Sequence, residues 1–467
     1  MDVVTAPAVV LRAAYAARTL SPVEVHDAVT AHVEATEPSL GRVFWELDPA
    51  RSRLAAVASA QRWRTGEALG PLDGIPVTVK ENLARAGVPM PSGTAAVTPV
   101  VPTVDAPVTA RLVEAGAVVL GSTVMPDWGM LSSGVSSLHG VTRSPLDRTL
   151  TTGGSSSGAG AAAAAGFGPL HVGTDIGGSI RLPGTWLGLV SLKPSAGRVP
   201  LASPYLGRVA GPMARSGADA AALMSVISRF DARDWSALPP AELDWRSVGR
   251  DEPASVLRGL RVGLHLDAGC GLALDPQVRA VVEATAARVA AAGAHVEVVA
   301  PFMREEWLRS LDLFWRVRSW NDLLALEPAA RERALPFVVR WASGGAEASG
   351  VEVLRAYQAT QSIRAATIAA TSAYDVVLSP VAPMAAFPAE WPMPWGPDED
   401  LGMAHIGYTA PYNMSGQPAA TVPGGRLADG REVGVQVSGR RWDDVGVLRR
   451  REAMEHAIEI LAGGRCK

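Results

Sequence analysis

Hydrophobic residues recur at helical spacing in the first part of the chain. Over residues 22–36 (PVEVHDAVTAHVEAT) apolar side chains return every three or four positions, which is the period of an amphipathic helix. Ser21 is a suitable N-cap for this helix, and Pro22 suits its first turn. The same pattern predicts a second helix over residues 49–65. We therefore expect a helical N-terminal segment over about residues 10–65 that packs on the rest of the protein.

Further along the chain, short apolar segments alternate with helical ones. This alternation predicts an α/β fold with a buried, largely parallel sheet. The segment from Pro380 to Pro397 contains six prolines and reads as a loop, and whether it lines a pocket is left open. Strands are predicted at residues 75–79, 117–120, 261–264, 295–299 and 375–378, and helices at residues 107–115, 158–165 and 276–292.

Composition is consistent with a single large domain. The chain has 467 residues, of which 48% are hydrophobic, and can bury a large core. It has no obvious linker, no repeat of fixed period and no polar low-complexity tract, so one domain over residues 1–467 is expected. The net charge of −3 and the pI near 6.3 argue against a nucleic-acid partner and favour a small molecule.

Membrane, disulfide and metal roles are not expected. The Ala- and Gly-rich stretch at residues 159–168 is too short and too weakly hydrophobic to span a bilayer. Asp2 stands where a signal peptide would carry basic residues, so we expect a cytoplasmic protein. The two cysteines, Cys270 and Cys466, are far apart, which disfavours both a disulfide framework and a metal site.

The sequence TTGGSSSGAG at residues 151–160 fits two unrelated motifs. With Ser156 as nucleophile it matches the G-x-S-x-G elbow of α/β-hydrolases, and from Gly158 onward it matches a G-x-G-x-x-A dinucleotide turn. Both motifs need a buried strand that runs into the turn. The preceding residues, RSPLDRTLTT, are polar and interrupted by proline, which disfavours both interpretations.

Lysine is rare in this chain, and that makes Lys80 conspicuous. Only three of the 43 basic residues are lysines, namely Lys80, Lys193 and Lys467. Lys80 ends the apolar segment GIPVTV, which reads as an interior strand. Burial would favour a neutral amine, which can act as a general base, whereas arginine cannot lose its proton. A snorkelling lysine paired with Glu81 is the other interpretation of this segment.

A second glycine-serine turn follows at residues 173–181, GTDIGGSIR. Gly177 and Gly178 precede Ser179, and this arrangement lets consecutive backbone N–H groups converge on one point, as an oxyanion hole requires. Asp175 could brace the loop through backbone hydrogen bonds, or it could be an ordinary turn aspartate.

These segments together resemble one known family. GIPVTVKEN, GGSSSGAG and GTDIGGSIRLP stand in this order, with Ser155 and Ser179 separated by 24 positions. The set closely resembles the amidase signature family, whose members hydrolyse or transfer acyl groups from amides with a Ser-cisSer-Lys triad. SPLDRTLTTGG, YNMSGQPAATVPGG and VGVQVSGR are similar to further family segments, so the resemblance runs from about residue 10 to 460, with a core at about 70–215. It implies a large mixed, mostly parallel sheet covered by helices on both faces.

The resemblance also implies roles for individual residues. Ser179 would be the nucleophile, Ser155 the bridging serine on a cis peptide, and Lys80 the base, without cofactor or metal. The backbone N–H groups of Ser179 and the three residues before it would face the oxyanion, and Ser156 and Ser157 would form local turn hydrogen bonds. The other implied positions are Gly129 beside the substrate amide, Asp175 and Arg181 as support for the nucleophile loop, Lys193 in a similar role, and Ile176, Gly177 and Gly178 as oxyanion donors.

The implied function is hydrolysis of a small carboxamide through a Ser179 acyl-enzyme. Acyl transfer to an amine acceptor, alone or as one subunit of an amidotransferase, is the alternative, and a non-catalytic scaffold is disfavoured by the retained Lys80. Departures from the family pattern, such as Ser157 in place of glycine, leave the substrate open, and a homodimer is also left open. An apolar or aromatic substrate is expected if Trp128, Met130, Trp391 and Trp395 line the pocket.

Overall fold

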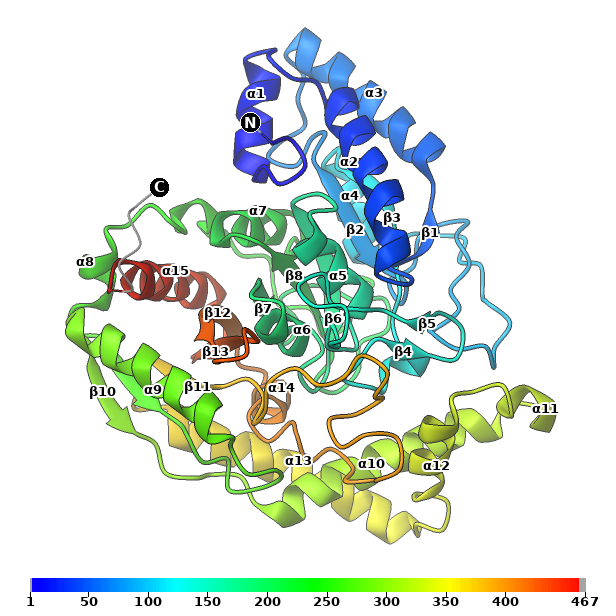
Figure 1. Ribbon diagram of the computed structural model, residues 1–467, viewed down its shortest axis with the longest axis vertical. Coiled ribbons are helices and arrows are strands. Elements are labelled where there is room, and N and C mark those ends of the chain that lie inside the picture. The colour runs from blue at the N-terminus through cyan, green and yellow to red at the C-terminus, as the bar shows by residue number, and fades with distance from the viewer. Residues whose placement is uncertain (1, 462–467) are drawn as a thin grey trace.

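An 11-stranded sheet forms the centre of the molecule (Figure 1). The computed structural model describes residues 2–461 of the chain. The strands lie in the order β1-β3-β2-β6-β8-β7-β12-β13-β11-β9-β10 across the sheet. Because β7 pairs with β12, strands from the two halves of the sequence share one continuous sheet.

The element bounds are as follows. The strands are β1 (Phe44–Leu47), β2 (Pro76–Lys80), β3 (Val118–Thr123), β6 (Leu170–Asp175), β7 (Val190–Lys193), β8 (Val209–Ala214), β9 (Arg261–Leu264), β10 (His295–Val298), β11 (Val376–Pro380), β12 (Ala419–Arg426) and β13 (Glu432–Gly439), with β4 (Val135–Ser136) and β5 (Gly140–Val141) as a separate pair. The helices are α1 (Ala8–Ala16), α2 (Pro22–Thr36), α3 (Pro49–Thr65), α4 (Pro107–Glu114), α5 (Ser157–Ala165), α6 (Arg181–Trp186), α7 (Gly217–Ile227), α8 (Pro253–Leu257), α9 (Pro276–Ala291), α10 (Glu305–Leu324), α11 (Pro328–Arg331), α12 (Pro336–Ser343), α13 (Gly350–Thr371), α14 (Ala410–Ser415) and α15 (Asp444–Leu461), with short 3-10 turns at Glu37–Ser39, Asp127–Gly129 and Trp245–Ser247.

The predicted mixed sheet is confirmed, but the prediction that it is mostly parallel is wrong. Of the ten neighbouring strand pairs described in the large sheet, six are antiparallel and four are parallel. The parallel pairs join strands separated in sequence by helices, which is the pattern that the alternation detects. The antiparallel majority comes from strands that the apolar pattern did not single out. One example is the β12–β13 hairpin, whose turn contains Asp429 and Gly430.

The two N-terminal helices form where the hydrophobic spacing predicts them. Helix α2 covers Pro22–Thr36 and α3 covers Pro49–Thr65. The Ser21 side chain accepts from the backbone N–H of Glu24, whose carboxylate in turn accepts from the N–H of Ser21. This capping box satisfies two polar groups at the helix start, and such caps typically stabilise a helix by about 1 kcal/mol.

Helices cover both faces of the sheet. On β8, Ala210 and Ala214 point to one face and join the largest hydrophobic cluster, which includes Leu223 of α7. Met213 has the opposite orientation and packs in a second cluster with Ala163 of α5. Because alternate residues of a strand point to opposite faces, the sheet is buried on both sides.

A group of helices built from α10, α12 and α13 lies at the end of the molecule opposite α1, α2 and α3 (Figure 1). A third hydrophobic cluster holds it together, with Leu311 and Trp315 of α10, Trp341 of α12 and Ile363 of α13. The same cluster includes Leu182 of α6, which follows the predicted nucleophile loop. This group of helices therefore packs against the loop that contains Ser179.

Strand β11 ends at Pro380, and the rest of the segment up to Pro397 forms a loop, as its prolines predict. Trp391 in this loop is 37% exposed, and Trp395 packs partly buried against the third cluster. Within residues 2–461 no helix is long and apolar enough to cross a membrane. Cys270 is a free thiol, while Cys466 lies outside the described residues.

Candidate active site

Lys80 is the last residue of β2, a strand in the interior of the sheet. Strand β2 pairs in parallel with β3 on one side and β6 on the other, and all five of its residues are buried. The Lys80 side chain is fully buried, and its Nζ donates to Ser155 Oγ at 2.9 Å and to Ser156 Oγ at 3.1 Å. The lysine therefore lies against the glycine-serine stretch, and no snorkelling toward solvent occurs.

Burial gives Lys80 the properties of a base at neutral pH. Desolvation, helped by the nearby Arg208 guanidinium, lowers the pKa of Lys80 to about 7, while Glu81 and Asp175 act in the opposite direction. Glu81 does not pair with Lys80, because its carboxylate lies 3.1 Å from His139 Nε2 and accepts the backbone N–H of Met125. A neutral amine is thus accessible at physiological pH.

Ser155 lies between Lys80 and a cavity. It follows a cis peptide bond from Gly154 and is 4% exposed. Gly129 lies next to it with φ +72°, and a Cβ atom on Gly129 would stand 3.1 Å from Ser155 Oγ. Glycine at this position therefore leaves the space beside the Ser155 hydroxyl open on the cavity side.

Ser179 reaches the same cavity from the loop between β6 and α6. The backbone N–H of Ser156 donates to the Ser179 carbonyl oxygen at 3.2 Å, which joins the two glycine-serine turns. Ser155 and Ser179 both line one cavity of about 520 Å³. Lys80 is outside the cavity wall and contacts it through Ser155. The structure thus places Lys80 against Ser155, and it places Ser155 and Ser179 in the wall of one cavity.

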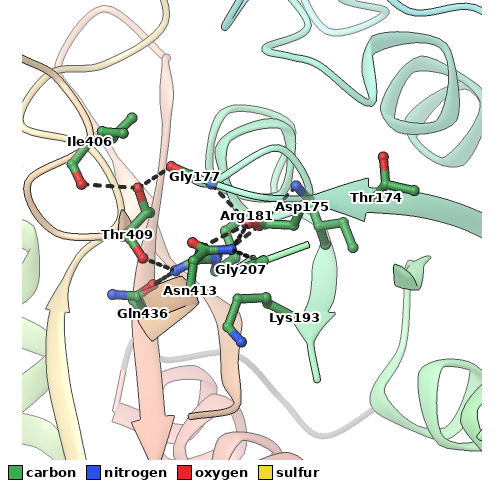
Figure 2. Close-up of polar contacts among 12 residues, drawn as sticks. Thr174, Asp175, Gly177, Arg181, Lys193, Gly207, Ile406, Thr409, Asn413 and Gln436 are labelled. Atoms are coloured by element: carbon green, nitrogen blue, oxygen red, sulfur yellow. Dashed lines mark hydrogen bonds and ion pairs between the residues drawn. The ribbon is translucent and has the colours of Figure 1, made fainter. Parts of the chain in front are cut away.

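Asp175 and Arg181 hold the loop that carries Ser179 (Figure 2). The Asp175 carboxylate accepts the backbone N–H groups of Gly178 at 2.8 Å and Ile180 at 3.1 Å. It also forms a two-point ion pair with Arg181, at 2.9 and 3.0 Å, and accepts from Asn413 Nδ2 at 2.8 Å. Burial alone would raise the pKa of Asp175, but the Arg181 charge and these hydrogen bonds hold that pKa well below its ordinary value.

Arg181 connects the loop to the C-terminal part of the chain. Its Nη1 donates to the Thr409 carbonyl at 3.0 Å and to Gln436 Oε1 at 2.7 Å, and its Nη2 donates to Asn413 Oδ1 at 2.5 Å (Figure 2). The Thr409 hydroxyl donates to the Gly177 carbonyl at 2.6 Å. These bonds fix the loop to the C-terminal part of the chain at several points.

Of the four backbone N–H groups predicted to face an oxyanion, one already has an acceptor within the protein. The N–H of Gly178 donates to Asp175, so this group is already used. Across residues 2–461 no acceptor is found for the N–H groups of Ile176, Gly177 and Ser179, which leaves these three available to a substrate. Gly178 has φ +132°, and its role is to allow the turn that Asp175 braces.

Ser156 and Ser157 do not form the local turn hydrogen bonds that the sequence predicts. Ser156 Oγ accepts from Lys80 and from the N–H of Thr174, and it donates to the Thr174 carbonyl at 3.0 Å. Ser157 Oγ donates to the distant Val124 carbonyl at 3.4 Å. Side chains in consecutive turn positions point in different directions, and sequence alone does not give their partners. Ser156 is thus a hydrogen-bond partner of Lys80 that sequence reasoning missed.

The backbone around residues 151–160 excludes both alternative motifs. No strand runs into α5, so neither a nucleophile elbow nor a dinucleotide turn is present. Gly160 serves packing instead, because a Cβ there would meet Pro183 and Leu187 at 2.9 Å. Glycine in α5 thus allows this helix to approach α6.

The cavity wall combines apolar and charged residues. Trp128 and Met130 line it as expected, but Trp391 and Trp395 do not. Helix α10 contributes Trp315 together with a charged residue, Arg318, and the segment before β8 contributes Arg208. In the described part of the chain no cluster of three or more His, Cys, Asp and Glu side chains could hold a metal ion.

Comparison with known proteins gives one consistent result. Residues 24–448 match the amidase family. An acylamidase of Rhodococcus erythropolis is 32% identical over 452 residues, covering 94% of this chain and 92% of the relative. A glutamyl-tRNA(Gln) amidotransferase subunit of Synechococcus sp. (strain CC9605) is 34% identical over 471 residues, covering 94% of each chain. The crystal structure of a bacterial aryl acylamidase of the amidase signature family superposes with a TM-score of 0.88 at 25% identity, covering 99% of each chain.

The fold and the family match define an amide-hydrolysing class of enzyme. The chain belongs to the amidase signature family.

Proposed function

We propose that this enzyme hydrolyses a small carboxamide through an acyl-enzyme on Ser179, with Ser155 and Lys80 as the proton relay. The observation that carries the proposal is the 2.9 Å hydrogen bond between Lys80 Nζ and Ser155 Oγ behind a cavity that both Ser155 and Ser179 line. We also propose that the whole chain acts as one amidase domain, since strands from both of its halves share the sheet.

In the first half-reaction, Ser179 Oγ attacks the amide carbonyl carbon. Its proton passes to Ser155 Oγ while the Ser155 proton passes to neutral Lys80 Nζ. The pKa of Lys80 near 7 supports this step, because about half of the amine is neutral at that pH. The N–H groups of Ile176, Gly177 and Ser179 stabilise the oxyanion of the tetrahedral intermediate, and loss of one such donor typically costs about 100-fold or more in rate.

Collapse of the tetrahedral intermediate completes the first half-reaction and returns the proton. When the C–N bond breaks, the proton on Lys80 moves back through Ser155 to the leaving nitrogen, so that ammonia or an amine departs neutral. Water then attacks the Ser179 ester with the same relay as base, and the products are a carboxylic acid and regenerated Ser179. The relay needs no histidine, and none of the eight histidines of the chain lines the cavity described.

The direct test is amide hydrolysis by the wild type and by Ser179→Ala. A panel of aliphatic, aromatic and ureido amides is incubated with each protein and the release of ammonia is followed. We expect turnover in the wild type alone, together with labelling of Ser179 by a fluorophosphonate. Equal ammonia release by Ser179→Ala, or labelling at another serine, would refute the assignment of Ser179.

Acyl transfer is a second candidate, and the similarity to an amidotransferase subunit favours it. In that case the acyl group on Ser179 passes to an amine instead of water. Addition of hydroxylamine to the hydrolysis assay separates the two functions. A transferase consumes amide faster as the amine concentration rises and forms the hydroxamate, whereas a strict hydrolase keeps its rate and forms the acid.

A further inference from the structure

Two arginines in the wall of the active-site cavity have no carboxylate partner. Arg208 precedes β8, and Arg318 lies on α10, so distant parts of the sequence bring them to the same cavity as Ser179. Both side chains are partly buried, and neither forms an ion pair within residues 2–461. A guanidinium cannot lose its proton in a protein, so both charges are present at every working pH.

The contacts that these arginines do make are weak. Arg208 donates to the backbone carbonyls of Asn82 at 3.3 Å and Ser203 at 3.5 Å. Arg318 donates to the sulfur of Met130 at 3.6 Å and lies over the Tyr205 ring at 4.9 Å, while its buried Nε has no hydrogen-bond partner in the described structure. Neutral acceptors of this kind leave most of the charge on each guanidinium uncompensated.

The four arginines of the described chain that are fully buried are each paired with a carboxylate. Arg316, two positions before Arg318 on α10, binds Asp312 at 2.6 Å and Asp400 at 2.7 Å. Arg181 binds Asp175 below the nucleophile loop. Partly buried arginines elsewhere, such as Arg215 and Arg364, also lack a carboxylate, but they donate to backbone carbonyls at 2.8 to 3.0 Å. Arg208 and Arg318 differ from them because they line the cavity and make only longer contacts. Asp322, also in the cavity wall, is exposed and forms no ion pair with either of them among the described residues.

The two charges also act on each other. Both lie beside Tyr205, since Arg318 stands over its ring at 4.9 Å and the backbone N–H of Arg208 donates to its carbonyl at 2.9 Å. Burial, together with the guanidinium of Arg318, lowers the pKa of Arg208. Such repulsion in a partly desolvated cavity is unfavourable, and an anion between the two groups would relieve it. Guanidinium groups bind carboxylates with two parallel hydrogen bonds, so two of them form a receptor for one carboxylate.

From this arrangement we infer that the substrate carries a carboxylate in addition to the amide, and that Arg208 and Arg318 bind it. The inference rests on the proposed amide hydrolysis and names its substrate class. It replaces the purely apolar substrate expected from Trp128 and Met130, which remain available to contact the carbon chain between the two groups. The carboxylate can belong to the acyl part or to the amine part of the substrate, and the test below separates these two sources.

Matched pairs of amides test the inference. Succinamate and glutaramate carry the charge on the acyl part, and succinamide and glutaramide are their neutral counterparts of nearly equal size. N-Acetylglycine and N-acetylglycinamide make the same comparison for the amine part. We expect the wild type to hydrolyse the charged member of at least one pair with a kcat/KM about 10- to 100-fold higher per amide group. In Arg318→Gln and Arg208→Gln this ratio should fall about 10-fold or more.

Arg309→Gln is the matched control. Arg309 lies on the same helix α10, but it is exposed, pairs with Glu305 and does not line the cavity, so the control removes the same charge without touching the proposed site. The substrate ratio should stay at its wild-type value in this variant. A wild type that hydrolyses the neutral members equally well, or a ratio that both cavity variants retain, would overturn the inference while leaving amide hydrolysis intact.

Protection of Ser179 from fluorophosphonate gives an answer even if no amide of the panel is cleaved. Succinate, glutarate and N-acetylglycine should slow labelling of the wild type, the neutral amides should not, and Arg318→Gln should lose the effect. Thermal melting of each variant checks that it is folded. Labelling that carboxylates leave unchanged contradicts the inference, whereas absence of any Ser179 labelling in the folded wild type contradicts the proposed function itself.

Discussion

Two buried lysines end two strands of the same sheet, and their surroundings differ. Lys80 ends β2 and Lys193 ends β7, and both side chains are fully buried. Burial lowers the pKa of each to about 7, with help from Arg208 for Lys80 and from Arg181 for Lys193. Lys80 Nζ donates to two serine hydroxyls, while Lys193 Nζ donates to the backbone carbonyl of Pro194 at 2.8 Å.

This difference shows that a lowered pKa does not by itself assign a catalytic role. Both lysines can be neutral at physiological pH, so both satisfy the electrostatic requirement for a general base. Only Lys80 adjoins a hydroxyl that opens onto the cavity, and a base must reach the proton that it abstracts. We interpret Lys193 as a structural residue whose neutral amine satisfies a backbone acceptor at the end of β7.

Replacement of each lysine by methionine is the most direct test of their different roles, because methionine keeps the side-chain length and removes the amine. Lys80→Met should lower kcat/KM for an amide by about 1000-fold or more, because the relay loses its base. Lys193→Met should lower it by less than about 10-fold, because no reacting group is touched. Lys80→Arg should be as inactive as Lys80→Met, since a guanidinium cannot accept a proton.

The measurement is steady-state kinetics on one cleaved amide, with circular dichroism and thermal melting as the control for folding. An active Lys80→Arg enzyme, or a folded Lys193→Met enzyme as inactive as Lys80→Met, would remove the basis for assigning the two lysines different roles.

Much of this site was predictable from sequence, for physical reasons that apply to particular residues. Lys80 stands out because nearly all other basic residues of the chain are arginines and because Lys80 ends an apolar strand. The helices at Pro22–Thr36 and Pro49–Thr65 are predicted with the bounds that the structure shows, since each begins with a capping residue followed by proline. Local signals of this kind depend on neighbouring residues alone.

The rest depends on contacts between distant segments. Ser156 contacts Lys80 and Thr174, and the direction of its side chain follows from the backbone of the turn. Arg208 and Arg318 are far apart in the sequence and meet only because α10 packs near the cavity. The antiparallel strands β8 and β12 were missed because Gly and Pro interrupt both of them.

The pH dependence of kcat/KM is a second test that distinguishes Lys80 from Lys193. The pKa of Lys80 lies at about 7, and the relay needs the neutral amine, so kcat/KM should rise with pH along a limb centred near pH 7. Between pH 8 and pH 6 we expect a loss of about 10-fold. Lys193→Met should keep this limb in place, although its own amine has the same pKa.

Arg208→Gln should move the limb to higher pH, because the Arg208 charge lowers the pKa of Lys80 and its removal lets that pKa rise. The profiles are measured on a neutral amide, so that the charge of the substrate does not change with pH. A limb that moves in Lys193→Met but not in Arg208→Gln is incompatible with Lys80 as the base.

Substitution of Ser156 tests whether its hydrogen bond to the Lys80 amine contributes to catalysis. Ser156→Ala removes one of the two hydroxyls that contact Lys80 Nζ, as well as both hydrogen bonds to Thr174. We expect kcat to fall about 5- to 10-fold, which corresponds to about one hydrogen bond, with KM nearly constant. Ser157→Ala is the control, because Ser157 Oγ contacts Val124 and not the lysine. Equal effects of the two substitutions on kcat would show that Ser156 acts only through stability.

The smallest effect concerns stability, and in this property the two lysines should behave alike. In the unfolded chain each amine keeps its ordinary pKa of 10.5, whereas in the folded protein the pKa is about 7. Between these values the unfolded state binds a proton that the folded state has lost, so the contribution of each lysine to the free energy of unfolding becomes less unfavourable as pH rises from 7 toward 10.5.

Replacement by methionine removes this dependence at either position. The stability of Lys80→Met and of Lys193→Met relative to wild type should therefore decrease by about 2 kcal/mol between pH 7 and pH 9 in both variants. Urea unfolding of the three proteins at these two pH values measures the effect. A similar change in both variants, beside activities that differ by about 1000-fold, would demonstrate that burial sets the pKa of each lysine and that contact with Ser155 gives Lys80 its function. A change in only one of the two variants would show that the two amines do not undergo the same shift in pKa on folding.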